Sequence, residues 1–179
     1  MTNLDVGIGT GEHGEFTTRP RAEICADLYR PQEKIDAQFV QCDAHNLPFR
    51  DKVFTIAHAH NLLEHISYAR GGILELQRVA SVVIVVQDHI WHVGNYATPS
   101  HLHFQLPGLR FIKYPRTRIG IRVSKLLEAF FRDSNIKIGR FWLSGTIRYV
   151  LSKTLNSSEH GQYTMAWHDG KWHKIKPEK

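Results

Sequence analysis

The first ninety residues alternate short apolar segments with turn residues. Five of these segments have the length and composition of strands: residues 3–6, 23–28, 37–42, 53–59 and 81–86. Continuous runs rich in β-branched residues are typical of strands that are buried on both faces, as in a parallel sheet covered by helices. Between the last two strands we predict a helix that carries Ile73, Leu74, Leu76 and Val79.

The second half of the chain predicts another helix and more strands. One stripe of an amphipathic helix is formed by Val123, Leu126, Leu127, Phe130 and Phe131. Residues 136–143 and 146–151 have strand composition, and Asp169-Gly170 between two aromatic segments is a strong hairpin signal. Together these elements predict an open, mostly parallel α/β sheet with an antiparallel edge strand and a C-terminal β-hairpin.

The composition limits the class of protein. With 179 residues, 42% hydrophobic and 22% charged, the chain fits a soluble globular domain. No apolar run approaches the roughly 18 residues of a membrane span, and Asp5 interrupts any signal-peptide pattern, so we expect no membrane association and a cytoplasmic location. Cys25 and Cys42 both lie in strand segments and are predicted to be reduced thiols.

Charge is unevenly distributed along the chain. Residues 1–100 hold 8 Lys and Arg against 12 Asp and Glu, a net charge of −4, whereas residues 101–179 hold 15 against 5, a net charge of +10. A basic second half suggests an anionic partner or substrate. A solvated basic surface without a partner is an equally good interpretation of the same excess.

Three alternating glycines, Gly7, Gly9 and Gly11, follow the first strand. Glycine permits positive φ and lets a ligand approach the backbone closely. Asp27 ends the second strand 20 residues after Gly7, where a carboxylate can accept hydrogen bonds from ribose hydroxyls. The third glycine comes one residue too early for the dinucleotide pattern, and the next ten residues favour helix poorly. A nicotinamide-dependent oxidoreductase is therefore disfavoured, whereas a ligand without phosphates is not.

Five motifs in order resemble those of class I S-adenosylmethionine-dependent methyltransferases. They occur within residues 3–90 and are L-D-V-G-I-G-T-G-E-H, I-C-A-D-L, F-V-Q-C-D-A-H-N-L-P-F-R-D-K-V-F, N-L-L-E-H-I and E-L-Q-R-V. The pattern is similar to the small-molecule branch, methyltransferase type 11. The resemblance implies a Rossmann-like sheet with helices on both faces and S-adenosyl-L-methionine as the cofactor. It also implies a methyltransferase domain over residues 1–155, followed by a tail over residues 156–179 that carries the hairpin.

Carried over residue by residue, the resemblance places the cofactor along the ends of the first four strands. Its methionine part would be lined by Asp5, Gly7, Gly9 and Gly11. Asp27 would hold the ribose, and Asp43 with Ala44 would lie beside the adenine. His60 and Asn61 would border the methionine and the transferable methyl group. Structural alternatives stay open, because Asp43 can also cap a turn and Asn61 can also cap a helix.

The chain departs from the family pattern in three places. Only Met1 and Thr2 precede the first strand, where the family usually has a helix. Only nine residues separate Asp27 from Ala37, so the helices that flank the second strand are short or absent. Thr55 stands where the family pattern has Asp after Phe. We therefore expect a more open cofactor pocket. A homodimer, in which a second subunit helps to bind the cofactor, stays open as an alternative.

Methyl transfer requires a general base only when the acceptor must first lose a proton. The resemblance implies that such a base lies near the ends of the fourth or fifth strand, where the candidates are His60, Asp88, His89, His101 and His103. His60 and His89 are our catalytic predictions. Two H-x-H pairs, His58/His60 and His101/His103, lack a Cys, Asp or Glu at a customary local spacing, so no metal site is predicted.

The methyl acceptor is not identified by the sequence. The resemblance favours a small molecule or a sugar. The segment His58-Ala59-His60-Asn61 stands where amino-methylating DNA enzymes carry their Asn/Asp-Pro-Pro-Tyr/Phe element. The alternative is a methyltransferase-like or non-catalytic module that acts on or binds nucleic acid through phosphate contacts of its basic second half.

Overall fold

The computed structural model describes residues 2–9, 22–31, 34–88, 100–106, 109–113 and 162–175. The chain divides into two compact units. One comprises Met1–Gln87 together with Tyr163–Lys179, and the other comprises Asp88–Gln162.

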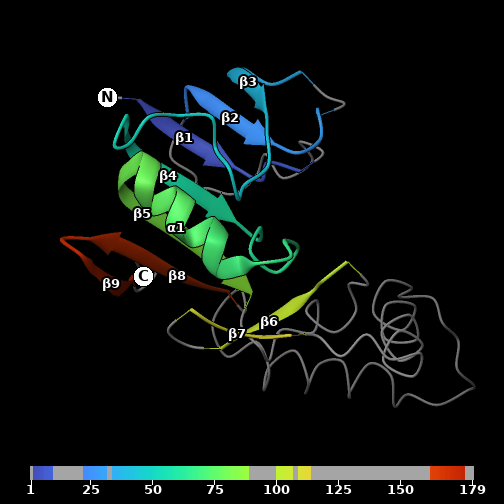
Figure 1. The fold of residues 1–179 in the computed structure, drawn as a ribbon, viewed down its shortest axis with the longest axis vertical. Coiled ribbons are helices and arrows are strands. Elements are labelled where there is room, and N and C mark those ends of the chain that lie inside the picture. Colours follow the sequence, from blue (N-terminus) through green and yellow to red (C-terminus); the bar gives the residue numbers. More distant parts are fainter. Residues whose placement is uncertain are drawn as a thin grey trace, which may run out of the picture. The chain divides into compact units, whose positions relative to one another are not determined.

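A seven-stranded sheet forms the first unit (Figure 1). In chain order its strands are β1 (Asn3–Val6), β2 (Ile24–Asp27), β3 (Gln38–Gln41), β4 (Phe54–His60), β5 (Ala80–Asp88), β8 (Gln162–His168) and β9 (Lys171–Ile175). The spatial order is β3-β2-β1-β4-β5-β8-β9, and the pairs among the first five strands are parallel. Strands β8 and β9 pair antiparallel around Asp169-Gly170. The predicted parallel sheet, antiparallel edge and C-terminal hairpin are confirmed.

The centre of the sheet forms the core, as the apolar segments predict. Leu4 of β1, Ala57 of β4 and Val83 of β5 are fully buried and lie opposite one another in adjacent strands. Cys25 is buried, Cys42 is half-buried, and neither forms a disulfide. These burial patterns agree with strands that are covered on both faces.

Helix α1 (Ala69–Val79) connects β4 to β5. Its inward-facing residues recur at helical spacing and include Ile73, Leu76 and Val79, all of which are buried. The helix ends where Ala80 adopts an extended conformation and begins β5 directly. It is not long and apolar enough to cross a membrane, and neither is any other helix in the part of the chain that the structure describes.

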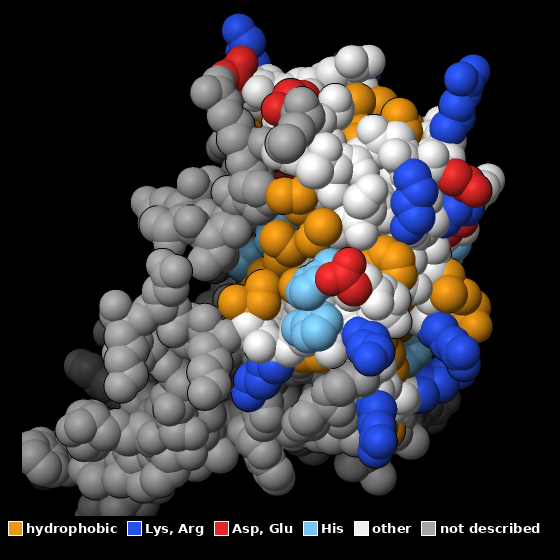
Figure 2. All heavy atoms as spheres, turned by 90° about the vertical axis from the view of Figure 1, so that its left-hand side faces the viewer, with side chains coloured by type: hydrophobic (Ala, Val, Ile, Leu, Met, Phe, Trp, Pro, Cys, Tyr) orange, Lys and Arg blue, Asp and Glu red, His pale blue; other side chains and the backbone are white. Residues whose placement is uncertain are grey.

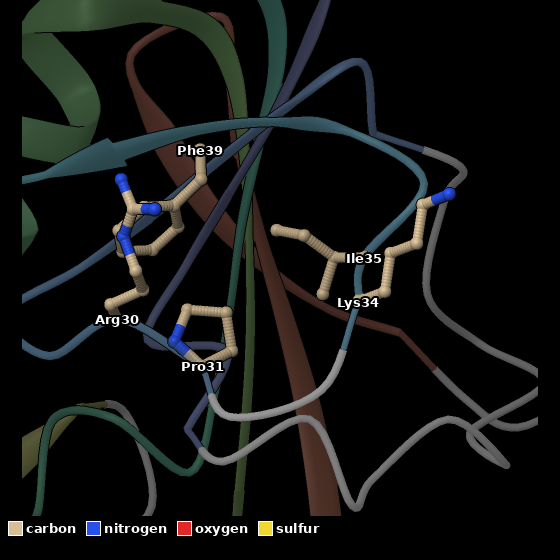
Figure 3. Close-up of a pocket in the computed structure, with 5 residues that line it drawn as sticks. All are labelled: Arg30, Pro31, Lys34, Ile35 and Phe39. Carbon is tan, nitrogen blue, oxygen red and sulfur yellow. The ribbon is translucent and has the colours of Figure 1, made fainter.

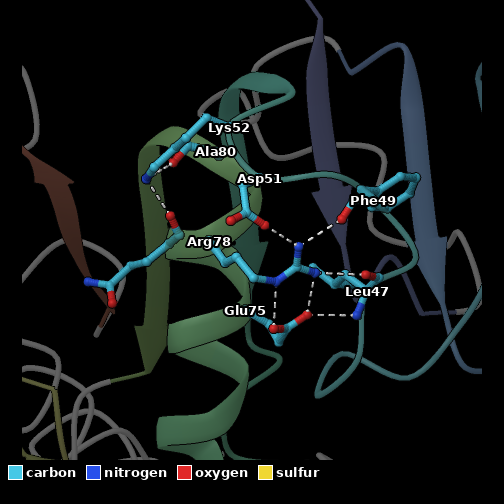
Figure 4. Close-up of polar contacts among 8 residues, drawn as sticks. Leu47, Phe49, Asp51, Lys52, Glu75, Arg78 and Ala80 are labelled. Carbon is cyan, nitrogen blue, oxygen red and sulfur yellow. Dashed lines mark hydrogen bonds and ion pairs between the residues drawn. The ribbon is translucent and has the colours of Figure 1, made fainter.

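A polar cluster around Arg78 fastens α1 to the segment that precedes β4 (Figure 4). The Arg78 guanidinium donates to both carboxylate oxygens of Glu75 and to Asp51 Oδ1 at 2.8–2.9 Å. It also donates to the backbone carbonyls of Phe49, at 2.8 Å, and Leu47, at 2.9 Å. Glu75 Oε2 in turn accepts the Leu47 N–H at 2.9 Å. We name the side chains of Arg78, Glu75 and Asp51 the Arg78 cluster.

Lys52 links the same region to the C-terminal hairpin. Its Nζ donates to the carbonyls of Gln77 and Ala80 at the end of α1. The ammonium also lies 4.6 Å from the ring centroid of Trp167 in β8, a cation–π contact. A residue next to β4 therefore holds the helix end and contacts a strand that is more than a hundred residues away in the sequence.

Exposed apolar side chains are scattered over the surface. Figure 2 shows one face, where apolar side chains alternate with Lys, Arg and other polar groups. The large exposed residues are Leu28, Tyr29, Val53, Tyr68, Leu74, Ile112 and Ile175. Single exposed apolar residues are ordinary on protein surfaces. Leu74, which the sequence pattern placed with Ile73 and Leu76, lies on the solvent side of α1.

The second unit contains a two-stranded antiparallel sheet of β6 (His103–Leu106) and β7 (Arg110–Lys113). The sequence pattern did not predict these strands. The predicted helix over residues 123–131 and the predicted strands at 136–143 and 146–151 lie outside the described residues. The domain boundary between residues 155 and 156 also lies there and stays a prediction.

Candidate cofactor site

The predicted cofactor residues gather at one edge of the sheet. Because β1 to β4 are parallel, their carboxyl ends share this edge. It carries Gly7 after β1, Asp27 as the last residue of β2, Asp43 after β3 and Asn61 after β4. From β1 the chain moves outward through β2 to β3, and then crosses to β4 on the other side of β1. Ligands of open α/β sheets bind at such a switch point, outside the carboxyl ends of the strands.

The turn after β1 requires glycine. Gly7 has φ +79° and Gly9 has φ +64°, both in the left-handed region. The Gly7 N–H donates to the Ala26 carbonyl at 2.9 Å, which continues the pairing of β1 with β2. The Gly9 N–H donates to Asp27 Oδ2 at 2.9 Å. The glycine turn is thus fastened to the end of β2. Gly11 lies outside the described residues.

Gly7 has a packing role that the sequence did not reveal. A Cβ at this position would lie 2.7 Å from Leu62 Cδ1 and 3.0 Å from Leu62 Cβ. Leu62 follows Asn61 in the loop after β4, so a side chain of the protein fills the space beside this glycine. The two loops at the switch point therefore pack together at Gly7.

Asp27 organises the backbone on both sides of the switch point. Its Oδ1 accepts the Tyr29 N–H at 3.0 Å, while Oδ2 accepts Gly9. Each carboxylate oxygen has a second lone pair, so both can accept another donor. Asp27 is half-buried.

Asp43 interacts with His45, two residues further on. Asp43 Oδ1 accepts the backbone N–H of His45 at 2.8 Å and lies 2.6 Å from its Nδ1. His45 Nε2 accepts the Tyr68 N–H at 3.2 Å, so the ring proton is on Nδ1 and points to the carboxylate. The backbone hydrogen bond, followed by the side-chain one, lowers the pKa of Asp43. Asp43 is exposed and Ala44 half-buried, so both the turn-capping and the adenine interpretations remain compatible with the geometry.

Asn61 adopts a strained backbone at the end of β4. Its φ is +48°, and its N–H donates to the Val86 carbonyl at 2.9 Å. Its side-chain Oδ1 is buried and has no hydrogen-bond partner among the described residues. Strained residues and unpaired buried acceptors are concentrated at functional sites.

The predicted catalytic histidines differ in position. His60 lies at the carboxyl end of β4 opposite Val86, but only 4% of its surface is exposed. His89 lies outside the described residues, and the side chain of Asp88 is not described. His101 and His103 belong to the second unit. Within the first unit, His60 is the base candidate whose side chain the structure describes, and it lies at the carboxyl end of β4.

Two buried polar pairs near this edge escaped the sequence analysis. Asp5 and His58 lie opposite each other in β1 and β4, with Oδ1 and Nδ1 3.3 Å apart. Glu64, after β4, accepts from Gln87 Nε2 of β5 at 2.8 Å, and both residues are almost fully buried. An H-x-H pattern on a strand was the available signal for His58, but its partner comes from a neighbouring strand that only the fold identifies.

A hollow of about 330 Å³ lies on the connection from β2 to β3 (Figure 3). It is lined by Arg30, Pro31, Lys34, Ile35 and Phe39. The Arg30 guanidinium lies 5.8 Å from the ring centroid of Phe39. The described residues of this connection contain no helix, as its length predicts.

Comparisons with known proteins give one family model and several solved structures. Residues 4–82 match the family model of a methyltransferase domain. The chain is similar to the solved structure of the YcgJ protein from Bacillus subtilis, with 23% identity and a TM-score of 0.42 over 56% of this chain and 53% of that one. It is also similar to a putative methyltransferase from Bacillus halodurans, with 20% identity and a TM-score of 0.43 over 56% and 54% of the two chains.

A third similar structure is a SAM-dependent methyltransferase from Thermotoga maritima, with 19% identity and a TM-score of 0.41 over 50% of this chain and 45% of that one. The matched part thus spans about half the length of each of these proteins. No curated protein matches the sequence. Residues 4–82, which make up less than half of the chain, are thus similar to a methyltransferase domain.

Proposed function

We propose that the chain binds S-adenosyl-L-methionine at the carboxyl edge of β1–β4 and transfers its methyl group to a small molecule or a sugar. The observation that carries this proposal is the contact of Asp27 with Gly9. It fastens a glycine turn to an acidic strand end at the switch point of the sheet. The resemblance of the sequence motifs implies that the ribose and the methionine bind here.

The described residues fit this cofactor. Asp27 keeps free acceptor capacity for ribose hydroxyls, and exposed Asp43 can accept from an exocyclic amine. The buried Asn61 Oδ1 offers an acceptor for a donor such as an ammonium group. Gly9 leaves its backbone accessible, since its surface is exposed.

The cofactor, when bound, supplies an activated methyl group on a sulfonium. The chain's own residues would bind and orient it and align the acceptor, and such positioning alone can lower a barrier by several kcal/mol. His60 is our candidate for the proton-accepting group beside the acceptor. Its burial restricts that role to acceptors that reach the end of β4.

Titration calorimetry with S-adenosylmethionine and S-adenosylhomocysteine tests the proposal. Micromolar binding of both compounds supports it. Absence of heat at millimolar ligand would contradict it, and the dinucleotide NAD serves as the negative control. Methyl transfer from labelled cofactor to a panel of sugars and small metabolites then tests activity.

The alternative is a module that binds nucleic acid through its basic second half. The net charge of +10 over residues 101–179 favours it. In that case the logarithm of the affinity for nucleic acid should fall linearly with the logarithm of the salt concentration. Reversing the charges of Arg116, Arg118 and Arg122 should make this slope less steep. A small-molecule enzyme should show a slope near zero. Sedimentation in the same buffers distinguishes a monomer from a homodimer.

A further inference from the structure

A carboxylate and an imidazole are buried together in the middle of the sheet. Asp5 and His58 lie directly opposite in β1 and β4, the two strands that flank the switch point. Asp5 Oδ1 is 3.3 Å from His58 Nδ1, and the exposed fractions of the side chains are 8% and 0%. Ionised carboxylates are rarely buried without a group that satisfies them, so this pair requires an explanation.

The hydrogen-bond geometry indicates the state of the pair. A carboxylate can only accept, so His58 must donate through Nδ1–H. His58 Nε2 is buried and has no hydrogen-bond partner among the described residues. An N–H at Nε2 would be a buried donor without an acceptor, on a charged ring. Its cost in free energy would be higher than that of an unpaired, unprotonated nitrogen. The arrangement therefore matches a His58 ring that donates to the Asp5 carboxylate through Nδ1 alone.

This carboxylate lies just below the proposed cofactor site. Side chains alternate along a strand, so Asp5 and position 7 share one face of β1. In the next strand, the register partner of Asp5 is Cys25, and Asp27 follows on the same face. The pair thus points to the face where Asp27 fastens the glycine turn.

The other register neighbours on this face do not carry a fixed charge. They are Cys25 on β2 and Ile84 on β5, and His60 follows His58 on β4 with ring centroids 6.1 Å apart. Among these described neighbours, Asp5 is the only carboxylate. A buried charge acts over longer distances than an exposed one, because the protein interior screens it weakly.

We infer that His58 is a positioning residue that orients the Asp5 carboxylate toward the cofactor site, so that the site binds the cationic sulfonium more tightly than the neutral sulfide product. This inference rests on the proposed function. S-adenosylmethionine carries one more positive charge than S-adenosylhomocysteine, at the sulfur. The buried anion therefore favours the substrate form, and its attraction for the ligand is reduced once the methyl group has been transferred.

The test measures the affinities of both compounds by calorimetry and compares their ratio between variants. Asp5→Asn removes the charge with little change in volume, and His58→Leu removes the donor. Both should shift the ratio toward S-adenosylhomocysteine by roughly 3- to 10-fold. His58→Asn keeps an N–H near the position of Nδ1 and should retain most of the wild-type ratio.

His168→Leu is the matched control, because His168 forms the same kind of pair with Asp169 at 3.0 Å, but on the exposed hairpin. It should leave the ratio unchanged. Equal weakening of both compounds in Asp5→Asn, with an unchanged ratio, would show a merely structural role and overturn the inference while the proposed function stands. If neither compound binds the wild-type protein, the proposed function itself fails, and the inference with it.

Discussion

The two edges of the central sheet satisfy their polar groups in opposite ways. At the amino edge, where β4 and β5 begin, Arg78 alone contacts two carboxylates and two carbonyls. At the carboxyl edge, Gly7, Gly9 and Asn61 have positive φ, and the buried Asn61 Oδ1 has no partner among the described residues. The amino edge therefore satisfies its acceptors with one cation, whereas the carboxyl edge keeps acceptor capacity available for a ligand.

Arg78→Met should cause the largest loss of stability. The variant keeps much of the aliphatic stem but leaves Glu75 without its cation and the carbonyls of Leu47 and Phe49 without a donor. We expect unfolding free energy to fall by about 3–4 kcal/mol. Urea denaturation measures it. Arg70→Met removes an exposed arginine from the first turn of the same helix and should change stability by less than about 0.5 kcal/mol. Equal effects of the two variants would contradict the special role of the Arg78 cluster.

Gly7→Ala tests strain at the carboxyl edge. Alanine at this position would have to keep a disfavoured positive φ, and its Cβ would clash with the Leu62 side chain. We therefore expect the free energy of unfolding to fall by about 2–4 kcal/mol. Gly170→Ala is the matched control, because Gly170 has φ +75° with nothing within 4 Å, and it should lose only about 1 kcal/mol. In the double variant with Leu62→Ala, the stability lost through the steric clash should be recovered, whereas the stability lost through the disfavoured φ should not. An equal loss of stability in Gly7→Ala and Gly170→Ala would show that the contact with Leu62 is unimportant.

Asp27→Ala should affect binding more than folding. It removes the acceptor for Gly9 and the proposed ribose contact, and we expect cofactor affinity to fall by about 1.5–3 kcal/mol. Calorimetry measures the change, and circular dichroism verifies the fold. Asp36→Ala, an exposed carboxylate on the β2–β3 connection, is the control and should bind the cofactor like the wild type. Wild-type affinity in Asp27→Ala would contradict the ribose assignment.

The sequence predicted the sheet well because the burial of each strand determines its pattern of apolar residues. Strands such as β5 are continuous apolar runs, and the Asp169-Gly170 signal correctly located the turn between β8 and β9. The short strands β6 and β7 were missed. Each is only four residues long: His103–Leu106 alternates polar and apolar residues too briefly to stand out, and Arg110–Lys113 does not alternate.

The candidate site was predictable only where its signal is local. Gly7, Gly9 and Asp27 follow strand ends, so the pattern of elements identified them. Contacts between distant segments carry no such signal: Leu62 against Gly7, and Asp5 opposite His58, depend on which strands are neighbours. Strand order results from tertiary packing, which one sequence does not specify residue by residue.

Lys52→Met tests how firmly the hairpin is fastened at the amino edge. Lys52 itself has φ +54°, a strain that its contacts with Gln77, Ala80 and Trp167 offset. Losing the ammonium should reduce stability by about 1–1.5 kcal/mol. Lys34→Met, an exposed lysine on the β2–β3 connection, should have no measurable effect. Faster hydrogen exchange in β8 of Lys52→Met would locate the loss in the hairpin, whereas unchanged exchange would contradict the link.

The smallest expected effect is a pH dependence of stability at the amino edge, due to Glu75. The hydrogen bonds from Arg78, with a weaker one from the Leu47 N–H, lower the pKa of Glu75 from its ordinary value of 4.5. A carboxyl whose folded pKa is depressed stabilises the protein above its unfolded pKa, and this contribution is lost as the pH falls through the folded pKa. The stability difference between wild type and Glu75→Gln should therefore be constant at neutral pH. It should shrink below pH 4.5 by no more than about 1 kcal/mol, because the cluster is partly exposed. In an Arg78→Met background the same comparison should be nearly independent of pH. A pH dependence that survives the loss of Arg78 would show that Glu75 owes its depressed pKa to another group.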